Sequence, residues 1–546
     1  MSLATVPPPM TSTETAPDAP TGLLATADHK RLGLLYIAGA LLFLLVGGAL
    51  GVALRGELAE SGNLLGDEYP RFFSMHATVG ALLGLAPLWV GLATYLVPLQ
   101  VGASRLALPR LHAFSLWLFL VGGGLVLAAY VMGPPAGLGL STVTPMGAPE
   151  GGAETEVVLW VVGLVLVGLA AVLAAVDLAV TVLALRTPGM TVSRVPLFSF
   201  ASFATSVAVV LATPVFLAGL VLLYVDQHYG GTFFGPDHGV TQAVWQHTLW
   251  LFGRPEVYLL LLPGLGAACD IVSTHARRPL FVRPAAQGAL ALFAAIPFLA
   301  WAAGTDVADA VVLPTYTPLT ALVAVPVGVL ALLWVGTMAF GAPRFHISLA
   351  FVVGFLGLAA FGAVNAGVAA FAEVDGNTAW TTAQVHVVAF GAPLLLAVAA
   401  LYHWAPKMWG QSLSAGLGGI VFLALFGGFF LNGLGTYLLG YDGAPAHVAD
   451  YADDVQLNYS RLAAAGGVLV ALGVLLLVAD VLRVASAARR VETAEADPYE
   501  GLTLEWAAAS PPPPANFTAV PEVRSAHPLH DLRATASAGA GAGASS

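Results

Sequence analysis

Long apolar runs separated by short polar stretches dominate the chain. Twelve runs are each about 20 residues long or more, which is enough for a helix to cross about 30 Å of hydrocarbon. They cover residues 32–54, 72–100, 112–132, 157–185, 199–225, 244–268, 285–303, 318–341, 347–372, 379–405, 414–439 and 462–485. The pattern predicts an all-α integral membrane protein with twelve transmembrane helices.

The two ends of the chain lack this pattern. Residues 1–27 and 486–546 are polar or rich in Pro, Ala, Ser and Gly, which is typical of disordered segments. The first apolar run is too long for a signal peptide and has no cleavage-site pattern, so we expect it to be retained. We therefore predict a disordered N-terminal tail over 1–27, a twelve-helix domain over 28–485, and a disordered C-terminal tail over 486–546 without a chemical role.

The composition agrees with a membrane location. Of the 546 residues, 58% are hydrophobic and only 9% are charged, and the mean hydropathy is +0.84. These values exclude a typical water-soluble domain. The one cysteine, Cys269, excludes a disulfide framework, and no P-loop, Rossmann or zinc motif is present. We expect membrane lipid around the chain and no nucleic-acid partner.

Basic residues favour the loops on one side of the predicted bundle. With twelve crossings, both termini lie on the same side, and the loops there hold Lys30, Arg31, Arg105, Arg110, Arg186, Arg194, Arg277, Arg278, Arg283, Arg344, Lys407, Arg483, Arg489 and Arg490. The other side holds only Arg55, Arg71 and Arg461. Because cytoplasmic loops carry an excess of Lys and Arg, we expect both termini in the cytoplasm and the chain in the plasma membrane.

The loops on the opposite side are acidic. Their carboxylates are Glu57, Glu60, Asp67, Glu68, Glu150, Glu154, Glu156, Asp442, Asp450, Asp453 and Asp454. Such a face suits a basic partner or a high-salt exterior, but simple solvation of the loops is the more ordinary explanation. The pattern alone leaves both interpretations open.

Two histidines lie at depth in the predicted membrane segments. His76 is about five residues into the second run and His386 about eight residues into the tenth. Both runs cross in the same direction, so the two imidazoles lie at similar depth and can face each other. Two imidazoles from different helices can bind one heme iron axially, and small residues such as Gly80 and Gly84 leave room for the ring. Each histidine could instead bond to a backbone carbonyl of a neighbouring helix.

Several motifs resemble subunit I of the heme-copper oxidase superfamily. They are SMHATVG followed by YLVPLQVGASRLALPRL, WLFGRPEVYLLLLPG, VAVPVG, and NTAWTTAQVH followed by LYHWAPKMWG, and they occur in the family order over roughly residues 28–485. The resemblance implies that His76 and His386 are the axial ligands of a low-spin heme, which we expect to be heme b. NTAW resembles the B-type, ba3-like branch, whereas Glu256 is more typical of the A-type branch.

The chain departs from the family where oxygen is reduced. The family binds copper through a histidine of the sixth helix and a His-His pair of the seventh, but Arg254 stands at the first position and no histidine occurs between His275 and His346. The histidine that binds the high-spin heme is replaced by Gln384, and glutamine is a poor ligand for heme iron. We therefore predict neither copper nor a second heme, and no confident catalytic residue.

An arginine within a membrane segment requires a polar partner. Arg254 is expected to face the bundle interior, since burial at mid-membrane costs roughly 3 kcal/mol on insertion scales. The candidate counter-ions are Glu256, Asp306, Asp309 and Asp177. Arg254 either fills the space left by the lost metal or neutralises a buried acid. Without the metal, Glu256 and Tyr258 are expected to be structural.

These features favour an electron-transfer subunit that resembles a cytochrome b. One alternative is a respiratory terminal oxidase or nitric oxide reductase with atypical ligands. Another is a hemeless scaffold, or a proton or solute pathway around Arg254. The resemblance also implies partner subunits of a respiratory complex, such as a subunit II-like protein or another redox partner.

Overall fold

The computed structural model describes residues 26–60, 64–132, 155–229, 233, 259–303, 322–374, 378–446, 448, 450, 451, 453–487, 495–520 and 522–533. The main helices are α1 (His29–Ala59), α2 (Tyr69–Thr78), α3 (Ala86–Val101), α4 (Pro109–Met132), α5 (Thr155–Ala184), α6 (Leu197–Tyr229), α8 (Arg283–Ala303), α10 (Ala324–Ala339), α11 (Ile347–Phe371), α12 (Ala379–Gln384), α13 (Ala392–Trp409), α14 (Ala415–Tyr441) and α15 (Asp454–Ala487). A further helix covers Leu259–His275.

The predicted all-α membrane architecture is confirmed. Within the described residues, nine helical segments are long and apolar enough to cross a membrane. The shorter apolar helices Leu259–His275, Arg283–Leu299 and Ala324–Ala339 lie within or overlap the predicted sixth, seventh and eighth segments. Every predicted membrane segment therefore contains a helix, and the chain is a multi-pass membrane protein.

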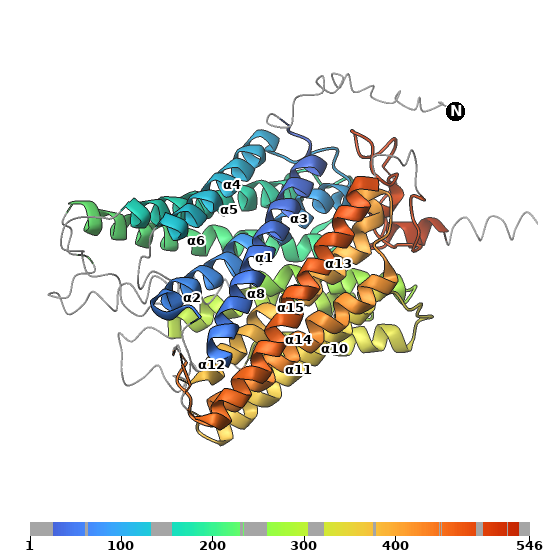
Figure 1. The fold of residues 1–546 in the computed structure, drawn as a ribbon. Helices are drawn as coiled ribbons and strands as arrows, with labels where there is room; N and C mark the ends of the chain where they lie inside the picture. Colours follow the sequence, from blue (N-terminus) through green and yellow to red (C-terminus); the bar gives the residue numbers. More distant parts are fainter. Residues whose placement is uncertain are drawn as a thin grey trace, which may run out of the picture.

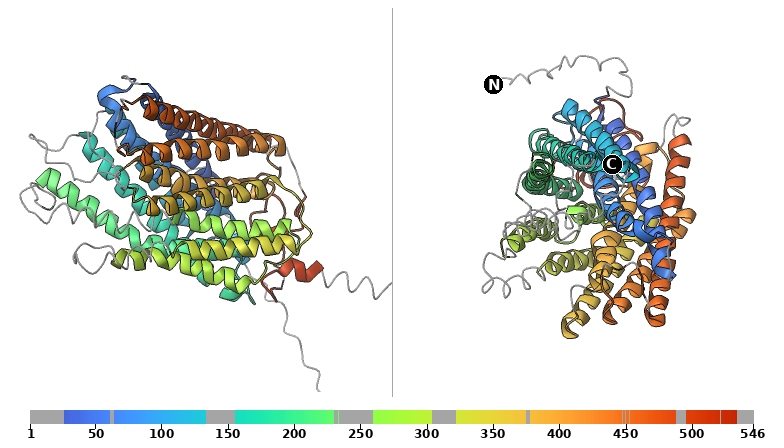
Figure 2. Two further views of the ribbon diagram at one scale, coloured as in Figure 1. Left: turned by 90° about the horizontal axis from the view of Figure 1, so that it is seen from below. Right: turned by 60° about the vertical axis from the view of Figure 1, so that its left-hand side comes forward.

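The helices form a bundle in which neighbours in sequence often pack together. In Figure 1, α15 lies between α1 and α14 on one flank, while α4, α5 and α6 form the opposite flank. Figure 2 shows the helices running roughly along one common direction. Small residues permit the close contacts: a Cβ atom on Gly428 of α14 would lie 2.8 Å from the carbonyl oxygen of Gly466 of α15.

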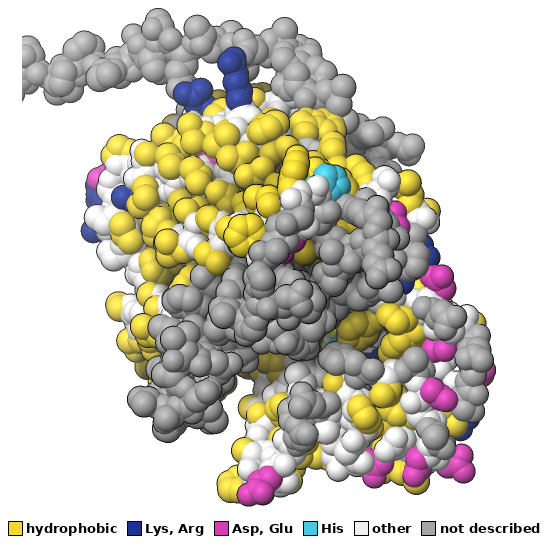
Figure 3. All heavy atoms as spheres, turned by 90° about the vertical axis from the view of Figure 1, so that its left-hand side faces the viewer, with side chains coloured by type: hydrophobic (Ala, Val, Ile, Leu, Met, Phe, Trp, Pro, Cys, Tyr) yellow, Lys and Arg dark blue, Asp and Glu magenta, His cyan; other side chains and the backbone are white. Residues whose placement is uncertain are grey.

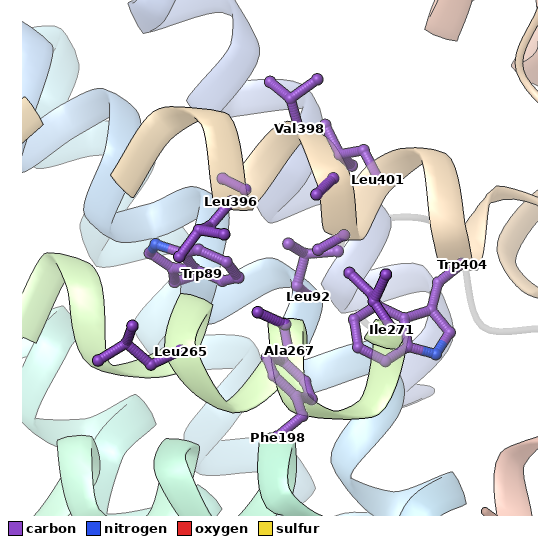
Figure 4. Packing of buried hydrophobic residues seen from close by; sticks show 14 of the residues in the cluster. Trp89, Leu92, Phe198, Leu265, Ala267, Ile271, Leu396, Val398, Leu401 and Trp404 are labelled. Carbon is purple, nitrogen blue, oxygen red and sulfur yellow. The ribbon is translucent and has the colours of Figure 1, made fainter. Parts of the chain in front are cut away.

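Two segments occupy the centre of the bundle. The most apolar stretch of Tyr69–Val101 is 89% buried and that of Ala379–Trp409 is 72% buried, whereas the other seven candidate spans are at most half buried. Figure 4 shows how α3, α13, α6 and the helix Leu259–His275 interlock, through Trp89, Leu92, Phe198, Leu265, Ala267, Ile271, Leu396, Val398, Leu401 and Trp404. The two central segments also carry His76 and His386, so the protein core positions these histidines.

Both central segments contain a π-helical turn. In the second, η3 (Val79–Leu85) joins α2 to α3, and in the tenth, η6 (Val385–Gly391) joins α12 to α13. Pro87 and Pro393 follow at the start of the next helix, where each removes a backbone donor. The N–H of Ala86 bonds to the carbonyl oxygen of Ala81, five residues back, and Ala392 bonds to Val387 in the same way. Such turns are frequent at functional sites.

The surface of the bundle suits a lipid environment. Large hydrophobic side chains point outward from several helices, including Leu332 of α10, Val353 and Phe371 of α11 and Leu423 of α14. Hydrophobic side chains also cover much of the face in Figure 3, while acidic side chains gather in its lower right part. Outward apolar side chains are stable in hydrocarbon and unfavourable in water.

The C-terminal prediction is wrong for residues 495–533. Residues 495–520 and 522–533, which we call the cap segment, pack against one end of the bundle, and Trp506 and Asn516 are at most 1% exposed. It contains the helical turn η8 (Leu504–Ala507) and a short helix over residues 528–533. A few buried anchors order this Pro- and Ala-rich segment, although its average composition is typical of disorder. We call the end of the bundle that carries the cap segment the cap end. The opposite end, where His76 and His386 lie, is called the histidine end.

Candidate functional site

His76 lies in α2 and is held by α1. Its Nδ1 atom is 2.9 Å from the carbonyl oxygen of Gly47. Gly51, one turn further along α1, leaves room for the ring, because a Cβ atom there would lie 3.0 Å from Cε1 of His76. With Nδ1–H donating to the carbonyl, Nε2 carries the free lone pair.

His386 lies in the π-helical segment η6 of the tenth predicted span. Its Nδ1 atom is 2.9 Å from the carbonyl oxygen of Thr382, four residues earlier in the chain. The two histidines are therefore anchored in the same manner, by an Nδ1–H donated to a backbone carbonyl. This anchoring is common among metal-binding histidines, since it sets the tautomer and the ring orientation.

The two imidazoles face each other across the histidine end. Their ring centres are 6.1 Å apart and their planes differ by 14°. Two imidazoles bound to opposite sides of one first-row metal ion, by bonds of about 2 Å each, have ring centres about 6 Å apart. The distance between the rings, the Nδ1–H bonds and the half-buried position of the pair between the central helices fit two residues that could together hold a heme iron.

Arg55 of α1 is a third member of the site, and the sequence interpretation placed it wrongly in a loop. It lies within the helix, is 8% exposed, and donates from Nη2 to Asn432 Oδ1 at 3.1 Å and to Thr436 Oγ1 at 3.2 Å. Its positive charge acts on both His76 and His386. Among the described residues, no ion pair to a carboxylate is formed by Arg55. A buried cation beside the histidine pair suits an anionic or polar edge of a macrocycle.

The sequence contains a signal that identifies Arg55. An ionisable residue inside an apolar helix is a functional candidate, and Arg55 belongs to the 31-residue helix that begins at His29. The first predicted segment ends at residue 54, so Arg55 was assigned to the first position outside the membrane.

Gln384 is held between two neighbouring helices. Its Oε1 atom accepts a hydrogen bond from the hydroxyl group of Tyr437 of α14, and its Nε2 atom lies 3.4 Å from the carbonyl oxygen of Gly362 of α11. Both ends of the amide are therefore used in helix–helix contacts. At this position, where the resemblance implies the ligand of a second heme, the side chain has a packing role.

Several other predicted positions lie outside the described residues. These are Arg254, Glu256, Tyr258, Asp306 and Asp309. The remaining candidate counter-ion, Asp177 of α5, is fully buried and lies 3.1 Å from Nδ1 of His112, and it accepts a hydrogen bond from the Leu108 amide at 2.6 Å. The carboxylate of Asp177 is thus engaged near the start of α4.

Comparison with known proteins identifies a family. Residues 31–470 match the model of the family described as "Cytochrome C and Quinol oxidase polypeptide I". A putative cytochrome c oxidase subunit 1-beta of Streptomyces avermitilis is 35% identical over 524 residues, covering 94% of this chain and 92% of that protein. A cytochrome c oxidase subunit 1 of Corynebacterium efficiens is 34% identical, covering 93% and 89% of the two chains.

A solved structure has the same fold. It is a heme-copper terminal oxidase dimer determined by cryo-electron microscopy, and its matching chain has a TM-score of 0.70, 18% sequence identity and 84% coverage of both chains. Fold, motifs and relatives agree, and heme is consistent with the histidine pair. The chain belongs to the family of cytochrome c and quinol oxidase subunit I proteins, membrane components of multisubunit respiratory complexes.

Proposed function

We propose that this chain is an electron-transfer subunit with one low-spin heme, bound axially by His76 and His386, and without an oxygen-reducing metal centre. The observation that carries the proposal is the histidine pair, with ring centres 6.1 Å apart and both Nδ1 atoms bonded to carbonyl groups. A bound heme supplies a one-electron carrier. If both His76 and His386 held its iron, such a heme would carry electrons and would leave no position for oxygen or carbon monoxide.

The residues around the pair have separate tasks. Gly47 and Thr382 orient the imidazoles through their carbonyl groups, which keeps both Nε2 atoms free to bind a metal. Arg55 places a positive charge beside the pair, and Asn432 and Thr436 hold its guanidinium group. A fixed cation stabilises the electron-rich state of a nearby redox group.

The sequence supports the proposed loss of the second metal centre. Arg254 replaces the copper-binding histidine of the sixth helix, and no histidine occurs from 276 to 345, where the family has a pair. Gln384 replaces the ligand of the high-spin heme, and Tyr437 and Gly362 engage its amide. We propose that Arg254 occupies the space of the lost copper, with Glu256 and Tyr258 as structural neighbours.

The proposal includes a location and partners. We place the chain in the plasma membrane with both termini in the cytoplasm, because the loops on that side hold most of the basic residues. The cap end is then cytoplasmic and the histidine pair lies near the outer surface. A subunit II-like protein or another redox partner would exchange electrons with the heme there. Residues 28–485 form the twelve-helix domain in this proposal.

The names of the relatives favour a second candidate, an active terminal oxidase with atypical ligands. Reduced-minus-oxidised spectra with and without carbon monoxide, together with metal analysis of the purified protein, separate the two. We expect one low-spin heme b per chain, no spectral change with carbon monoxide, and no copper. Carbon monoxide binding with copper would support the oxidase, and a protein without heme would contradict both.

The charge of Arg55 gives a further test. We expect Arg55→Met to lower the reduction potential of the heme by roughly 50–100 mV, equivalent to about 1–2 kcal/mol at an effective dielectric constant near 20. Potentiometric titration of the heme absorbance measures the shift. Arg461→Met is the matched control, because Arg461 is exposed and bonds to Ala59 and Asn458. Equal reduction potentials of the heme in the Arg55→Met variant and in the unmodified protein would show that Arg55 does not act on the heme.

A further inference from the structure

The cap segment docks through bonds that need a folded bundle. Lys407 of α13 donates from Nζ to the carbonyl oxygen of Ala508 at 2.6 Å and to that of Ala496 at 3.0 Å. On another side, Asn516 accepts a hydrogen bond from Lys30 Nζ at 3.0 Å and donates to the carbonyl oxygen of Ala103 at 2.8 Å. The segment is thus tied to helices that are distant in sequence.

Glu505 is the one acid of the cap segment that is fully enclosed at this interface. It is 0% exposed, and its Oε1 atom accepts hydrogen bonds from Gln100 Nε2 at 3.0 Å and Trp404 Nε1 at 3.2 Å. Its Oε2 atom is buried as well, and the Thr503 hydroxyl and the backbone amide of Glu505 are the other donors close to the carboxyl group. A carboxylate that is fully buried and has no ion pair among the described residues is costly, whereas the neutral acid is much less so.

A second buried carboxyl group shares the same amide. Gln100 Nε2 is 3.4 Å from Oδ2 of Asp270, which also accepts a hydrogen bond from the Phe198 amide at 3.1 Å. Ser199 donates to the other end of the amide, at 2.7 Å from Gln100 Oε1. Two carboxyl groups held on one amide repel each other when both are ionised, which favours a proton on one of them.

We propose that the cap segment is a pH-sensitive closure of the cap end, docked while Glu505 is protonated and released when Glu505 ionises. Asp270 keeps its bonds to the start of α6, so it is the carboxyl group that remains in the bundle when the segment leaves. Release exposes Gln100 and Trp404 and uncovers the histidines His275 and His403, which Tyr499 and Trp506 now cover.

Other charged groups face this interface. Lys407 lies on α13 and acts on Glu505, Arg283 acts on Asp270 from the start of α8, and Asp497 of the cap segment pairs with Arg533. Lys407 and Arg283 favour ionised acids, but neither forms an ion pair with Glu505 in the described residues. The positive charges of Lys407 and Arg283 therefore weaken the preference of the buried acids for the protonated form, but they do not abolish it.

The direction of the pH effect follows from burial. Burial raises the pKa of Glu505 above its usual range. The contribution of Glu505 to docking is therefore fully present below its free pKa of about 4.3 and is lost as the pH rises through its docked pKa. Burial also raises the pKa of Asp497, which adds an effect of the same sign. The Glu505→Gln variant separates the two acids.

His346 has the opposite effect at low pH. It bonds to the Tyr499 hydroxyl at 3.2 Å, and burial lowers its pKa to about 4. Docking therefore weakens as the pH falls from about 6.5 toward 4. The titration of Glu505 is measured from pH 6.5 to 9, above this range and below the ionisation of Tyr499, whose pKa is raised by burial. Burial also lowers the pKa of Lys407 to about 8, so loss of its proton within this window favours docking and opposes the effect of Glu505. The Glu505→Gln variant keeps the Lys407 contribution and removes that of Glu505.

Two neighbouring positions provide a matched pair of probes. The Ser510 side chain is 2% exposed and that of Ala509 is exposed. Ser510→Cys and Ala509→Cys variants of the full chain are labelled with a membrane-impermeant maleimide in open membrane fragments. The measured quantity is the labelling rate of Ser510→Cys divided by that of Ala509→Cys, a ratio in which the pH dependence of thiol reactivity cancels. The native Cys269 is fully buried.

We expect this ratio to rise with pH, by up to about tenfold per pH unit, because release of the segment is linked to the loss of one proton. With Glu505→Gln, which keeps the acceptor oxygen and cannot ionise, the ratio should stay low across the range. A flat ratio in the protein with native Glu505 would overturn the proposal even if the Gln variant failed to fold. An equal rise with Glu505→Gln would assign the effect to another group and would also overturn it.

Discussion

Replacing His386 with alanine is expected to abolish the low-spin heme signal while the chain remains folded. His386 is one of two imidazoles that face each other at 6.1 Å, and heme held by one histidine alone loses half of its axial bonds. We expect the heme content per chain to fall by at least about tenfold, as loss of a metal ligand exceeds the 10–100-fold effect of its supporting partners. Absorbance spectra normalised to protein content measure it, and gel filtration with circular dichroism monitors folding.

The control for this experiment is His228→Ala. His228 is an exposed histidine of α6 and is far in sequence from both members of the pair, so its loss should leave the heme unchanged. Gly51→Ala is an independent approach, since its Cβ atom would lie 3.0 Å from His76 Cε1, and it should shift the heme band. Gly48→Ala, with 3.6 Å to Ala471, should have no effect. Unchanged heme in the His386→Ala variant would contradict the proposed ligand pair.

Replacing Trp506 with alanine is expected to release the cap segment at all pH values. Its ring is 1% exposed and packs edge-on against His403 and Tyr499, with ring centres 5.4 Å and 5.5 Å away, and Lys407 Nζ lies 5.2 Å from its centre. Loss of a buried tryptophan costs about 3–5 kcal/mol, so docking should weaken by more than about a hundredfold. Labelling of Ser510→Cys relative to Ala509→Cys measures the release.

The matched control for Trp506→Ala is Tyr499→Phe. This change keeps the ring against His403 and removes only the hydroxyl group that bonds to His346, which is worth about 1 kcal/mol. Labelling of Ser510→Cys should then change by less than about tenfold. A Trp506→Ala variant labelled no faster than this control would mean that tryptophan burial does not hold the segment.

The sequence predicted the histidine pair more fully than the rest of the site. His76 and His386 lie about five and about eight residues from the starts of two predicted segments that run in the same direction, so their similar depth follows from helix geometry. The orientation of their rings depends on carbonyl groups of Gly47 and Thr382, and the first of these belongs to another helix. The sequence pattern does not predict which backbone carbonyl group faces which imidazole ring.

Arg55 and Gln384 illustrate what pattern reading leaves out. Arg55 stands at the edge of an apolar run, and a shift of one residue decides whether it is read as buried or as solvated. Its partners, Asn432 and Thr436, lie nearly 400 positions later in the chain. Gln384 was identified by its place in a motif, but its contacts with Tyr437 and Gly362 follow from the packing of α11, α12 and α14.

The sequence by itself determined the membrane architecture and the family, because long apolar runs have one stable arrangement in a bilayer and the motifs occur in one order. Only the tertiary structure decided the ring geometry of the histidine pair, the burial of Arg55 and the docking of the cap segment. Each of these depends on a few contacts between distant residues. For residues 495–533, anchors such as Glu505, Trp506 and Asn516 outweigh a composition that favours disorder.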